Sequence, residues 1–434
     1  MSLQSLLIRL ATSLLLAFSL ASCKQDSPPD GAPQNFQAFN GDQAITVTWT
    51  QEPGQTYFVF VAQTDSANRD NILNQPEPRV FSGVTSPFTF TVNNNDRPYT
   101  VLMSATQGTS KAGPSTAPIT VTPRRAGDAW VQGDNNLAMD DIRSVSFGLN
   151  RFVLTGSNGG LFTLEGPLQA SPSRPAMESS SFAAANMPTK EGVLATQFIT
   201  SPQTRFIAVG SGGSAFLSAN GVDGWTKVTT GVKTALNGLT HSGGTTIAVG
   251  DDGVILSSSD GGSTWTRRGE NATSEDLLAV TSALGRFIAV GRNGVILVAT
   301  SPDSWSVLPS GVMESLNAIS GNSAEAVIVG DKGSILQINN AITPVVVQQT
   351  SNVSVNLRAV TLSSQFVISG DNSTFLRGAS FDANTNQYTW TVVTPTRVDG
   401  TTAADSVAQN ALIYAYNRLL SFGSAGSYFV SPQP

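Results

Sequence analysis

The stretch Ile-Ala-Val-Gly-Asp-Asp-Gly-Val-Ile-Leu-Ser-Ser-Ser-Asp-Gly-Gly-Ser-Thr-Trp, from Ile247 to Trp265, decides the fold of most of this 434-residue chain. An apolar run ends in a glycine, a short polar turn follows, and a second apolar run begins. Asp-Gly and Asn-Gly pairs supply the positive φ that tight hairpins need. The stretch therefore predicts two adjacent antiparallel strands.

This unit repeats along the second part of the chain. The copies are Phe152–Gly156, Phe206–Gly210, Ile247–Gly250, Phe287–Gly291, Val327–Gly330 and Phe366–Gly370, with a diverged last copy at Leu412–Tyr416. Four of the intervals are 39 to 41 residues, and an insertion around residues 167–188 accounts for the longer one. Seven copies of this length predict a seven-bladed β-propeller over residues 128–434, with four strands in each blade. The last copy has no polar cap, which favours a closed ring over an open solenoid.

A closed ring needs a strand that joins its two ends. The segment Asp128–Gly133 resembles the outer strands that begin at Trp225 and Trp265. We expect it to complete the last blade, and Tyr428–Val430 is the alternative segment for that position.

The beginning of the chain predicts a lipid anchor. An apolar run from Leu10 leads to Leu-Ala-Ser-Cys at residues 20–23, and Cys23 is the single cysteine. This pattern is typical of a bacterial lipoprotein signal, and the run is shorter than the ~20 residues of a membrane-spanning helix. We expect a signal peptide over 1–22, an acylated tether over 23–31 that stays extended and buries no apolar surface, and a protein anchored in the cell envelope. Lys24 after the cysteine favours the outer membrane.

Composition narrows the classes of partner. The chain has 30 acidic and 24 basic residues and a net charge of -6. A surface with net negative charge argues against nucleic acid as a binding partner, because the phosphate backbone is also negative. With its one cysteine acylated, the mature chain has no disulfide, so its stability must come from burial.

Residues 32–123 alternate apolar and polar positions, as strands with one buried face do. The runs are Ala44–Thr50, Tyr57–Val61, Phe88–Val92, Tyr99–Ala105 and Ile119–Pro123. The segment resembles a fibronectin type III domain through Pro33, Trp49, Tyr57 and Tyr99. The resemblance implies a small β-sandwich that serves as a spacer or adhesive module.

The segment Ser-Ser-Asp-Gly-Gly-Ser-Thr-Trp, from Ser258 to Trp265, resembles the Asp-box, or bacterial neuraminidase repeat. Its defining positions are Ser258, Asp260, Gly262 and Trp265, and weaker echoes place Asn220 and Thr300 where the aspartate stands. The resemblance implies a structural turn at the propeller's periphery, with Asp260 accepting N–H groups of its own turn and Trp265 packed beneath it.

A second resemblance covers Ile142 to Trp390, and most clearly Leu236 to Gln337. These copies are similar to the photosystem II stability and assembly factor family of seven-bladed propellers. The family implies a non-enzymatic assembly scaffold whose partner here is an unidentified envelope protein.

Candidate catalytic groups are few. His241 is the single histidine, and we expect it in a solvated turn after an inner strand. Metal sites of the His or Cys type are excluded by count, and we expect no cofactor. A sialidase would need three arginines around a carboxylate and a Tyr–Glu nucleophile pair, and no convincing set is found. A carbohydrate-binding or glycan-degrading lipoprotein remains the alternative.

One set of residues points to a binding surface. Each stands one residue after the apolar start of a predicted inner strand: Arg143, Asn237, Leu278, Asn317 and Arg358. Because side chains alternate along a strand, these residues share one face and could line a rim of the central channel. Two arginines and two asparagines there could bind a carboxylate-rich peptide or a sugar.

Overall fold

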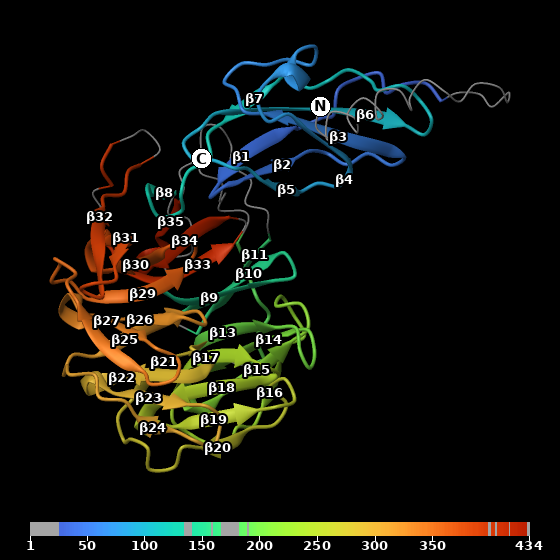
Figure 1. Cartoon of the computed structure of the whole chain (residues 1–434). Coiled ribbons are helices and arrows are strands. Elements are labelled where there is room, and N and C mark those ends of the chain that lie inside the picture. Colours follow the sequence, from blue (N-terminus) through green and yellow to red (C-terminus); the bar gives the residue numbers. More distant parts are fainter. Residues whose placement is uncertain are drawn as a thin grey trace. The chain divides into compact units, whose positions relative to one another are not determined.

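The computed structural model describes residues 26–133, 141–157, 159–165, 182–188, 191–397, 401–403, 406–415 and 417–431. Cys23 and the predicted signal peptide lie outside these residues. Regular structure is almost entirely β (Figure 1). None of the helical segments in the described ranges has the length and apolar character needed to cross a membrane.

The chain divides into two compact units. The first contains Thr48–Phe88, Tyr99–Thr120 and the described residues up to Gln37. The second contains Ala38–Val47, Thr89–Pro98 and the described residues from Val121 onward.

The N-terminal third of the chain supplies two sheets, of strand orders β1-β2-β5 and β4-β3-β6-β7. Their strands are β1 Gln37–Gly41, β2 Ala44–Thr48, β3 Gln55–Ala62, β4 Arg79–Val84, β5 Phe88–Thr91, β6 Tyr99–Gln107 and β7 Ile119–Val121, with a 3₁₀ turn η2 at Ile72–Asn74. Each alternating run of the sequence coincides with one of these strands. The structure adds β1 and β4.

The start of the described chain differs from the tether that the sequence predicts. Pro29 is buried, and a Cβ placed on Gly113 would come within 2.7 Å of the Pro29 carbonyl oxygen. The Asp26 carboxylate accepts a hydrogen bond from the backbone N–H of Thr109 at 3.1 Å. The expectation that this segment buries no apolar surface is therefore wrong at Pro29, because the proline ring packs within its own unit.

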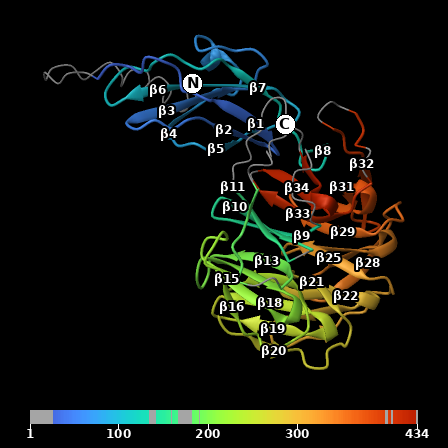
Figure 2. The same ribbon diagram turned by 180° about the vertical axis from the view of Figure 1, so that it is seen from behind.

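The remaining described strands form seven four-stranded sheets, which we number blades 1 to 7 in chain order. Blades 1 to 6 are β9–β12, β13–β16, β17–β20, β21–β24, β25–β28 and β29–β32, and blade 7 is β33–β35 with β8. The first strand of each blade lies beside the first strand of the next, and β33 returns to β9. Figures 1 and 2 show these sheets arranged about a common centre. The predicted seven-bladed propeller is confirmed.

The strand bounds follow the repeat. They are β8 Val131–Gln132, β9 Ile142–Gly148, β10 Arg151–Gly156, β11 Leu161–Glu165, β12 Phe182–Ala184, β13 Val193–Ile199, β14 Arg205–Gly210, β15 Ala215–Ser218, β16 Thr226–Val228, β17 Leu236–Ser242, β18 Thr245–Gly250, β19 Ile255–Ser258, β20 Thr266–Arg268, β21 Leu277–Ala283, β22 Arg286–Gly291, β23 Ile296–Ala299, β24 Ser306–Val307, β25 Leu316–Gly321, β26 Glu325–Gly330, β27 Ile335–Asn339, β28 Val345–Gln349, β29 Leu357–Leu362, β30 Phe366–Gly370, β31 Phe375–Asp382, β32 Gln387–Val393, β33 Gln409–Ala415, β34 Arg418–Gly423 and β35 Tyr428–Ser431. The predicted insertion contributes β12, and its residues 167–181 lie outside the described ranges.

The second strand of each blade is buried along nearly its whole length, as its continuous apolar run predicts. Tight turns join the second and third strands. In blade 3 the turn η5, Asp251–Gly253, holds Asp252 at a φ of 54°. Asn and Asp tolerate this left-handed conformation better than most residues, which is why they recur at this place.

The last copy of the repeat is corrected by the structure. The run Leu412–Tyr416 lies mainly in β33, the inner strand of blade 7, and not in the second strand. The second strand is β34, which ends at Gly423. Both strands are apolar enough to carry the pattern, so the sequence alone assigns them to the wrong positions.

The ring closes through β8. Val131 and Gln132 pair with Val430 and Phe429 of β35, so β8 is the outer strand of blade 7, as expected. On its other side the Gln132 N–H donates to the Thr396 carbonyl at 2.8 Å. The alternative segment, Tyr428–Val430, lies in β35, the third strand.

Candidate functional site

The inner strand of every blade has a β-bulge at its second residue. In blade 3, Leu236 pairs with Gly250 and Gly238 pairs with Val249, so Asn237 is left out of the ladder. A bulge turns its side chain away from the regular alternation. The seven bulged residues, which we call the bulge ring, are Arg143, Leu194, Asn237, Leu278, Asn317, Arg358 and Asn410.

The repeat glycine explains the bulge. A Cβ on Gly250 would lie 2.0 Å from the carbonyl oxygen of Ala235, just before the inner strand. That carbonyl accepts the N–H of Asp251 at 3.0 Å. The φ of Gly250 is -162°, so glycine is needed for the close approach and not for its backbone conformation. The motif that reveals the fold therefore also positions the bulge ring.

The sequence pattern finds five members of this ring and misses Leu194 and Asn410. The connection between β13 and β14 is longer than in blades 3 to 6, so Leu194 falls out of the repeat's spacing. Asn410 is missed because the last copy is assigned to the wrong strand. Its spacing to Gly423 is the signal that could have found it.

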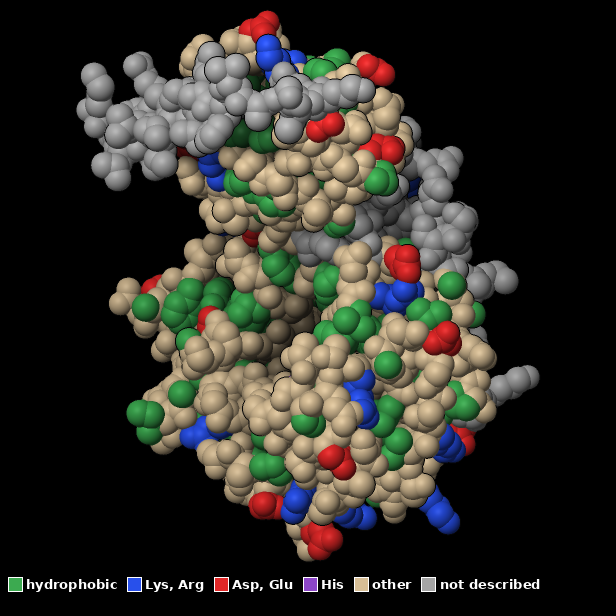
Figure 3. Space-filling view, turned by 90° about the vertical axis from the view of Figure 1, so that its right-hand side faces the viewer, with side chains coloured by type: hydrophobic (Ala, Val, Ile, Leu, Met, Phe, Trp, Pro, Cys, Tyr) green, Lys and Arg blue, Asp and Glu red, His purple; other side chains and the backbone are tan. Residues whose placement is uncertain are grey.

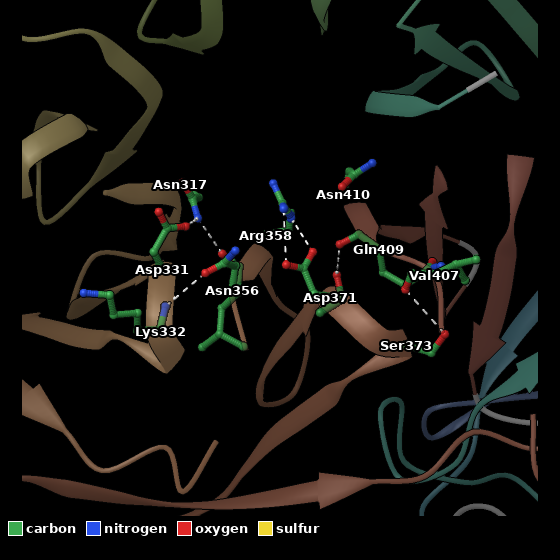
Figure 4. Close-up of polar contacts among 12 residues, drawn as sticks. Asn317, Asp331, Lys332, Asn356, Arg358, Asp371, Ser373, Val407, Gln409 and Asn410 are labelled. Atoms are coloured by element: carbon green, nitrogen blue, oxygen red, sulfur yellow. Dashed lines mark hydrogen bonds and ion pairs between the residues drawn. The ribbon is translucent and has the colours of Figure 1, made fainter. Parts of the chain in front are cut away.

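The asparagines of the ring join neighbouring blades. The Asn237 amide donates to the Leu277 carbonyl at 3.0 Å, and it donates to Asp251 of its own blade at 2.8 Å. Asn317 repeats both contacts, with Leu357 at 2.9 Å and Asp331 at 2.8 Å (Figure 4). An amide group has two N–H donors. The donors of Asn237 and Asn317 are therefore already occupied within the ring.

Asn410 makes the corresponding contact across the seam. Its amide donates to the carbonyl of Ile142 at 3.0 Å, which links blade 7 to blade 1. Figure 4 shows Asn317, Arg358 and Asn410 in a row, on the starts of three successive inner strands.

The two arginines differ in their surroundings. The Arg358 guanidinium donates to both oxygens of Asp371, from Nε at 2.7 Å and from Nη2 at 3.2 Å, and its side chain is 39% exposed. Arg143 is exposed, and no described residue accepts a hydrogen bond from its guanidinium. Arg143 is thus the member of the ring best placed to meet an anionic group.

A shallow pocket of about 340 Å³ lies beside this part of the ring. Its lining includes Asn356, Asp371, Asn372, Ser354 and Ser406. Asp371 already faces Arg358, and the other four side chains are uncharged and polar. The pocket therefore offers hydrogen-bonding groups without an aromatic surface.

Charge is spread thinly over the molecule. On the face that Figure 3 shows, the blue and red side chains are scattered and do not gather into a patch of one sign. Several of the cations are paired, such as Arg292 with Asp276 at 2.9 Å and Lys227 with Glu191 at 2.6 Å. Across the described ranges, no three His, Cys, Asp or Glu residues are grouped to hold a metal ion.

His241 lies in strand β17 and not in a solvated turn, so that expectation is wrong. Its Nδ1 is 2.9 Å from the hydroxyl of Thr246, its partner on β18. Burial lowers the pKa of His241 below its ordinary value, which favours the neutral ring. Strand β17 extends to Ser242 because His241 and Ser242 pair with Thr246 and Thr245 of β18.

A Tyr–Glu pair, which the sequence does not reveal, joins blades 5 and 6. The Tyr388 hydroxyl of β32 donates to Glu325 of β26 at 2.6 Å. Burial, reinforced by this hydrogen bond and by the negative charge of Glu325, raises the pKa of Tyr388 well above its ordinary value. Because Tyr388 and Glu325 lie on different blades, their hydrogen bond links blades 5 and 6.

The turn Ser258–Trp265 has its own hydrogen-bond network. The Asp260 carboxylate accepts the N–H of Thr264 at 2.9 Å, the Thr264 hydroxyl at 2.6 Å and the Ser258 hydroxyl at 2.8 Å. Partial burial alone would raise the pKa of Asp260, but the hydrogen bonds from Thr264 and Ser258 outweigh it and lower that pKa. Trp265 packs against Ile207 and Leu217 of the preceding blade. The turn thus lies at the boundary between blades 2 and 3.

Comparison with solved structures agrees with the propeller. YCF48 from Cyanidioschyzon merolae is 12% identical, with a TM-score of 0.51 over 70% of this chain and 98% of that one. The WD40 propeller domain of Doa1 is 11% identical, with a TM-score of 0.52 over 71% and 97%. A structure of YCF48 bound to D1 peptide is 13% identical, with a TM-score of 0.50 over 70% and 96%. The sequence matches no protein-family model and no curated protein. The likeness therefore shows the fold, a β-propeller.

Proposed function

We propose that this protein is a non-enzymatic cell-envelope lipoprotein that serves as an interaction or assembly scaffold, and that it binds a protein partner at the bulge ring. The observation that carries the proposal is the exposed Arg143, whose guanidinium has no acceptor among the described residues, whereas the other polar members of the ring are held by hydrogen bonds within the propeller. A carboxylate of the partner would accept two parallel N–H hydrogen bonds from such a guanidinium. The YCF48 structure with D1 peptide supports a peptide partner for a propeller of this shape.

The proposal is tested by affinity capture from envelope extracts with the purified mature protein. Arg143→Gln should weaken binding at least about tenfold and so lower the amount of captured partner, since a hydrogen bond to a charged group contributes roughly 1.5–3 kcal/mol. Arg267→Gln is the matched control, because Arg267 is exposed on the outer strand β20. Equal capture by wild type and Arg143→Gln would place the partner elsewhere.

The anchor is part of the same proposal. We expect Cys23→Ala to leave an uncleaved or soluble protein that takes up no labelled palmitate, because the thiol is the group that receives the lipid. Labelling and fractionation of cells that express each variant provide the measurement. Palmitate incorporation equal to wild type would exclude acylation at Cys23.

For the N-terminal third we propose a fibronectin type III-like spacer. The strand orders β1-β2-β5 and β4-β3-β6-β7 support this assignment. The spacer would hold the propeller off the membrane. Capture by a variant that lacks residues 33–123 should retain the partner. Because Ala38–Val47 and Thr89–Pro98 belong to the propeller's unit, loss of the partner would give this segment a direct role only if thermal melting shows that the shortened propeller is still folded.

The second candidate is a glycan-binding or glycan-degrading lipoprotein. The turn Ser258–Trp265, with its resemblance to an Asp-box, favours it. A glycan array and turnover of a fluorogenic sialoside provide the test. Turnover that a single carboxylate substitution abolishes would replace the scaffold by a hydrolase.

A further inference from the structure

The bulge ring is chemically two-sided. In order from blade 1 to blade 7 its members are Arg143, Leu194, Asn237, Leu278, Asn317, Arg358 and Asn410. Because β33 of blade 7 lies beside β9 of blade 1, the two arginines stand on either side of blade 7. The two leucines stand on either side of blade 3. One arc of the ring therefore carries its two arginines, of which Arg358 is paired with Asp371 and Arg143 is not, and another arc carries its two leucines.

The asparagines cannot account for this division. Asn237, Asn317 and Asn410 donate to carbonyls of the next blade, so their amides serve the ring itself. The four remaining members make no such contact between inner strands. They are the side chains that a partner can meet.

The two leucines are not part of the propeller core. Leu194 and Leu278 are partly exposed, and neither belongs to a core cluster formed by the described residues, although the preceding Val193 and Leu277 are fully buried. Apolar surface that is left partly in water gains free energy when an apolar side chain covers it. This arc therefore favours an apolar group of the partner.

The ring also distinguishes a peptide from a sugar. None of its seven members is aromatic, so it presents no flat ring on which a sugar could stack. Its arginines match carboxylates and its leucines match aliphatic or aromatic side chains. A peptide carries both kinds of group on one short segment.

This inference rests on the binding at the bulge ring proposed above: we propose that the partner is bound through an amphipathic peptide segment. Its acidic group lies over the arginine arc of blades 6, 7 and 1, and its apolar side chain lies over the leucine arc of blades 2 to 4.

The test is selection of a linear random-peptide phage library on the purified mature protein, followed by fluorescence anisotropy of the enriched peptides. Enriched peptides should carry both an acidic and an apolar residue. Arg143→Gln should weaken their binding about tenfold. Changing the peptide's acid to its amide should then cause no further loss, since each change removes the same interaction.

Leu194→Ser and Leu278→Ser should weaken binding only for peptides that keep their apolar residue. Arg267→Gln and Val307→Ser are the matched controls, because both residues are exposed on outer strands. Thermal melting of each variant shows whether the propeller remains folded.

The outcomes separate this inference from the scaffold proposal. One outcome is that enriched peptides lose affinity on substitution of the bulge ring and yet carry only an acidic residue or only an apolar residue. That result would overturn the amphipathic segment but leave the proposed binding at the bulge ring standing. Peptides that are indifferent to the ring substitutions overturn both. Failure of any peptide to be enriched also counts against both.

Discussion

Asp260 illustrates how much one side chain contributes to the blade that carries it. Its carboxylate accepts three hydrogen bonds within the turn, from the Thr264 N–H, the Thr264 hydroxyl and the Ser258 hydroxyl. In blade 2 the corresponding residue is Asn220, whose amide oxygen accepts the N–H groups of Val222 and Asp223 at 2.9 and 3.1 Å. The turn thus needs an acceptor at this position, and either residue supplies one.

We predict that Asp260→Ala lowers the free energy of unfolding by roughly 1–3 kcal/mol, because it leaves the Thr264 N–H without its acceptor. Asp260→Asn is the matched control and should cost less, as Asn220 indicates. Thermal and urea unfolding by circular dichroism provide the measurement. An Ala variant that unfolds like wild type would show that the turn does not depend on Asp260.

The same residue predicts a pH dependence. Because the folded-state pKa of Asp260 is lowered, its stabilising contribution is present above the unfolded-state pKa of aspartate and is lost as the pH falls through the folded-state value. Asp260→Asn removes this contribution. The stability difference between wild type and Asp260→Asn should therefore shrink in acid.

At the scale of the blade, the repeat glycine shapes the blade itself, and the tryptophan before the outer strand joins it to the preceding blade. The glycine lets the inner strand approach its own hairpin, as Gly291 does with the Asp276 carbonyl, where a Cβ would be 2.0 Å away. The tryptophan joins one blade to the one before. Trp225 packs on Val153 and Leu161 of blade 1, as Trp265 packs on blade 2.

The repeat glycine and the tryptophan together explain why blades that share few residues have the same shape. The glycine specifies the bulge within a blade, and the aromatic ring specifies the contact between blades. Trp130, next to the closing strand β8 of blade 7, makes the same kind of contact with the preceding blade. Its ring stacks on Phe375 of blade 6, with centroids 4.2 Å apart and planes at 19°.

At the scale of the whole molecule, closure of the ring depends on a strand of two residues, β8. We predict that Trp130→Ala lowers the free energy of unfolding by about 3–5 kcal/mol, because Trp130 is 1% exposed and anchors that strand. Trp305→Ala is the matched control, since Trp305 is more exposed and lies away from the seam. Unfolding in urea and limited proteolysis should show the larger effect, with new cleavage near residue 130, in the Trp130 variant.

Equal destabilisation by the two substitutions would contradict a special role for the seam. Unchanged proteolysis of Trp130→Ala would do the same.

The sequence by itself determined the propeller, its seven repeats and its hairpins, and it left Asp128–Gly133 and Tyr428–Val430 as candidates for the strand that closes the ring. These follow from patterns of burial and turn chemistry that are local to each copy. The diverged last copy shows the limit of such patterns, because β33 and β34 are both apolar and only pairing distinguishes them.

The tertiary structure alone decided which side chains of the ring are free. Asn237 is joined to a carbonyl 40 residues away, and Asn410 is joined to one 268 residues away across the seam. Periodicity reports which face of a strand is buried and does not report which group on another blade lies within reach. Asn237 and Arg143 occupy the same position in their copies of the repeat. Only the closed ring shows that Asn237 is hydrogen-bonded to the next blade, whereas Arg143 is left exposed.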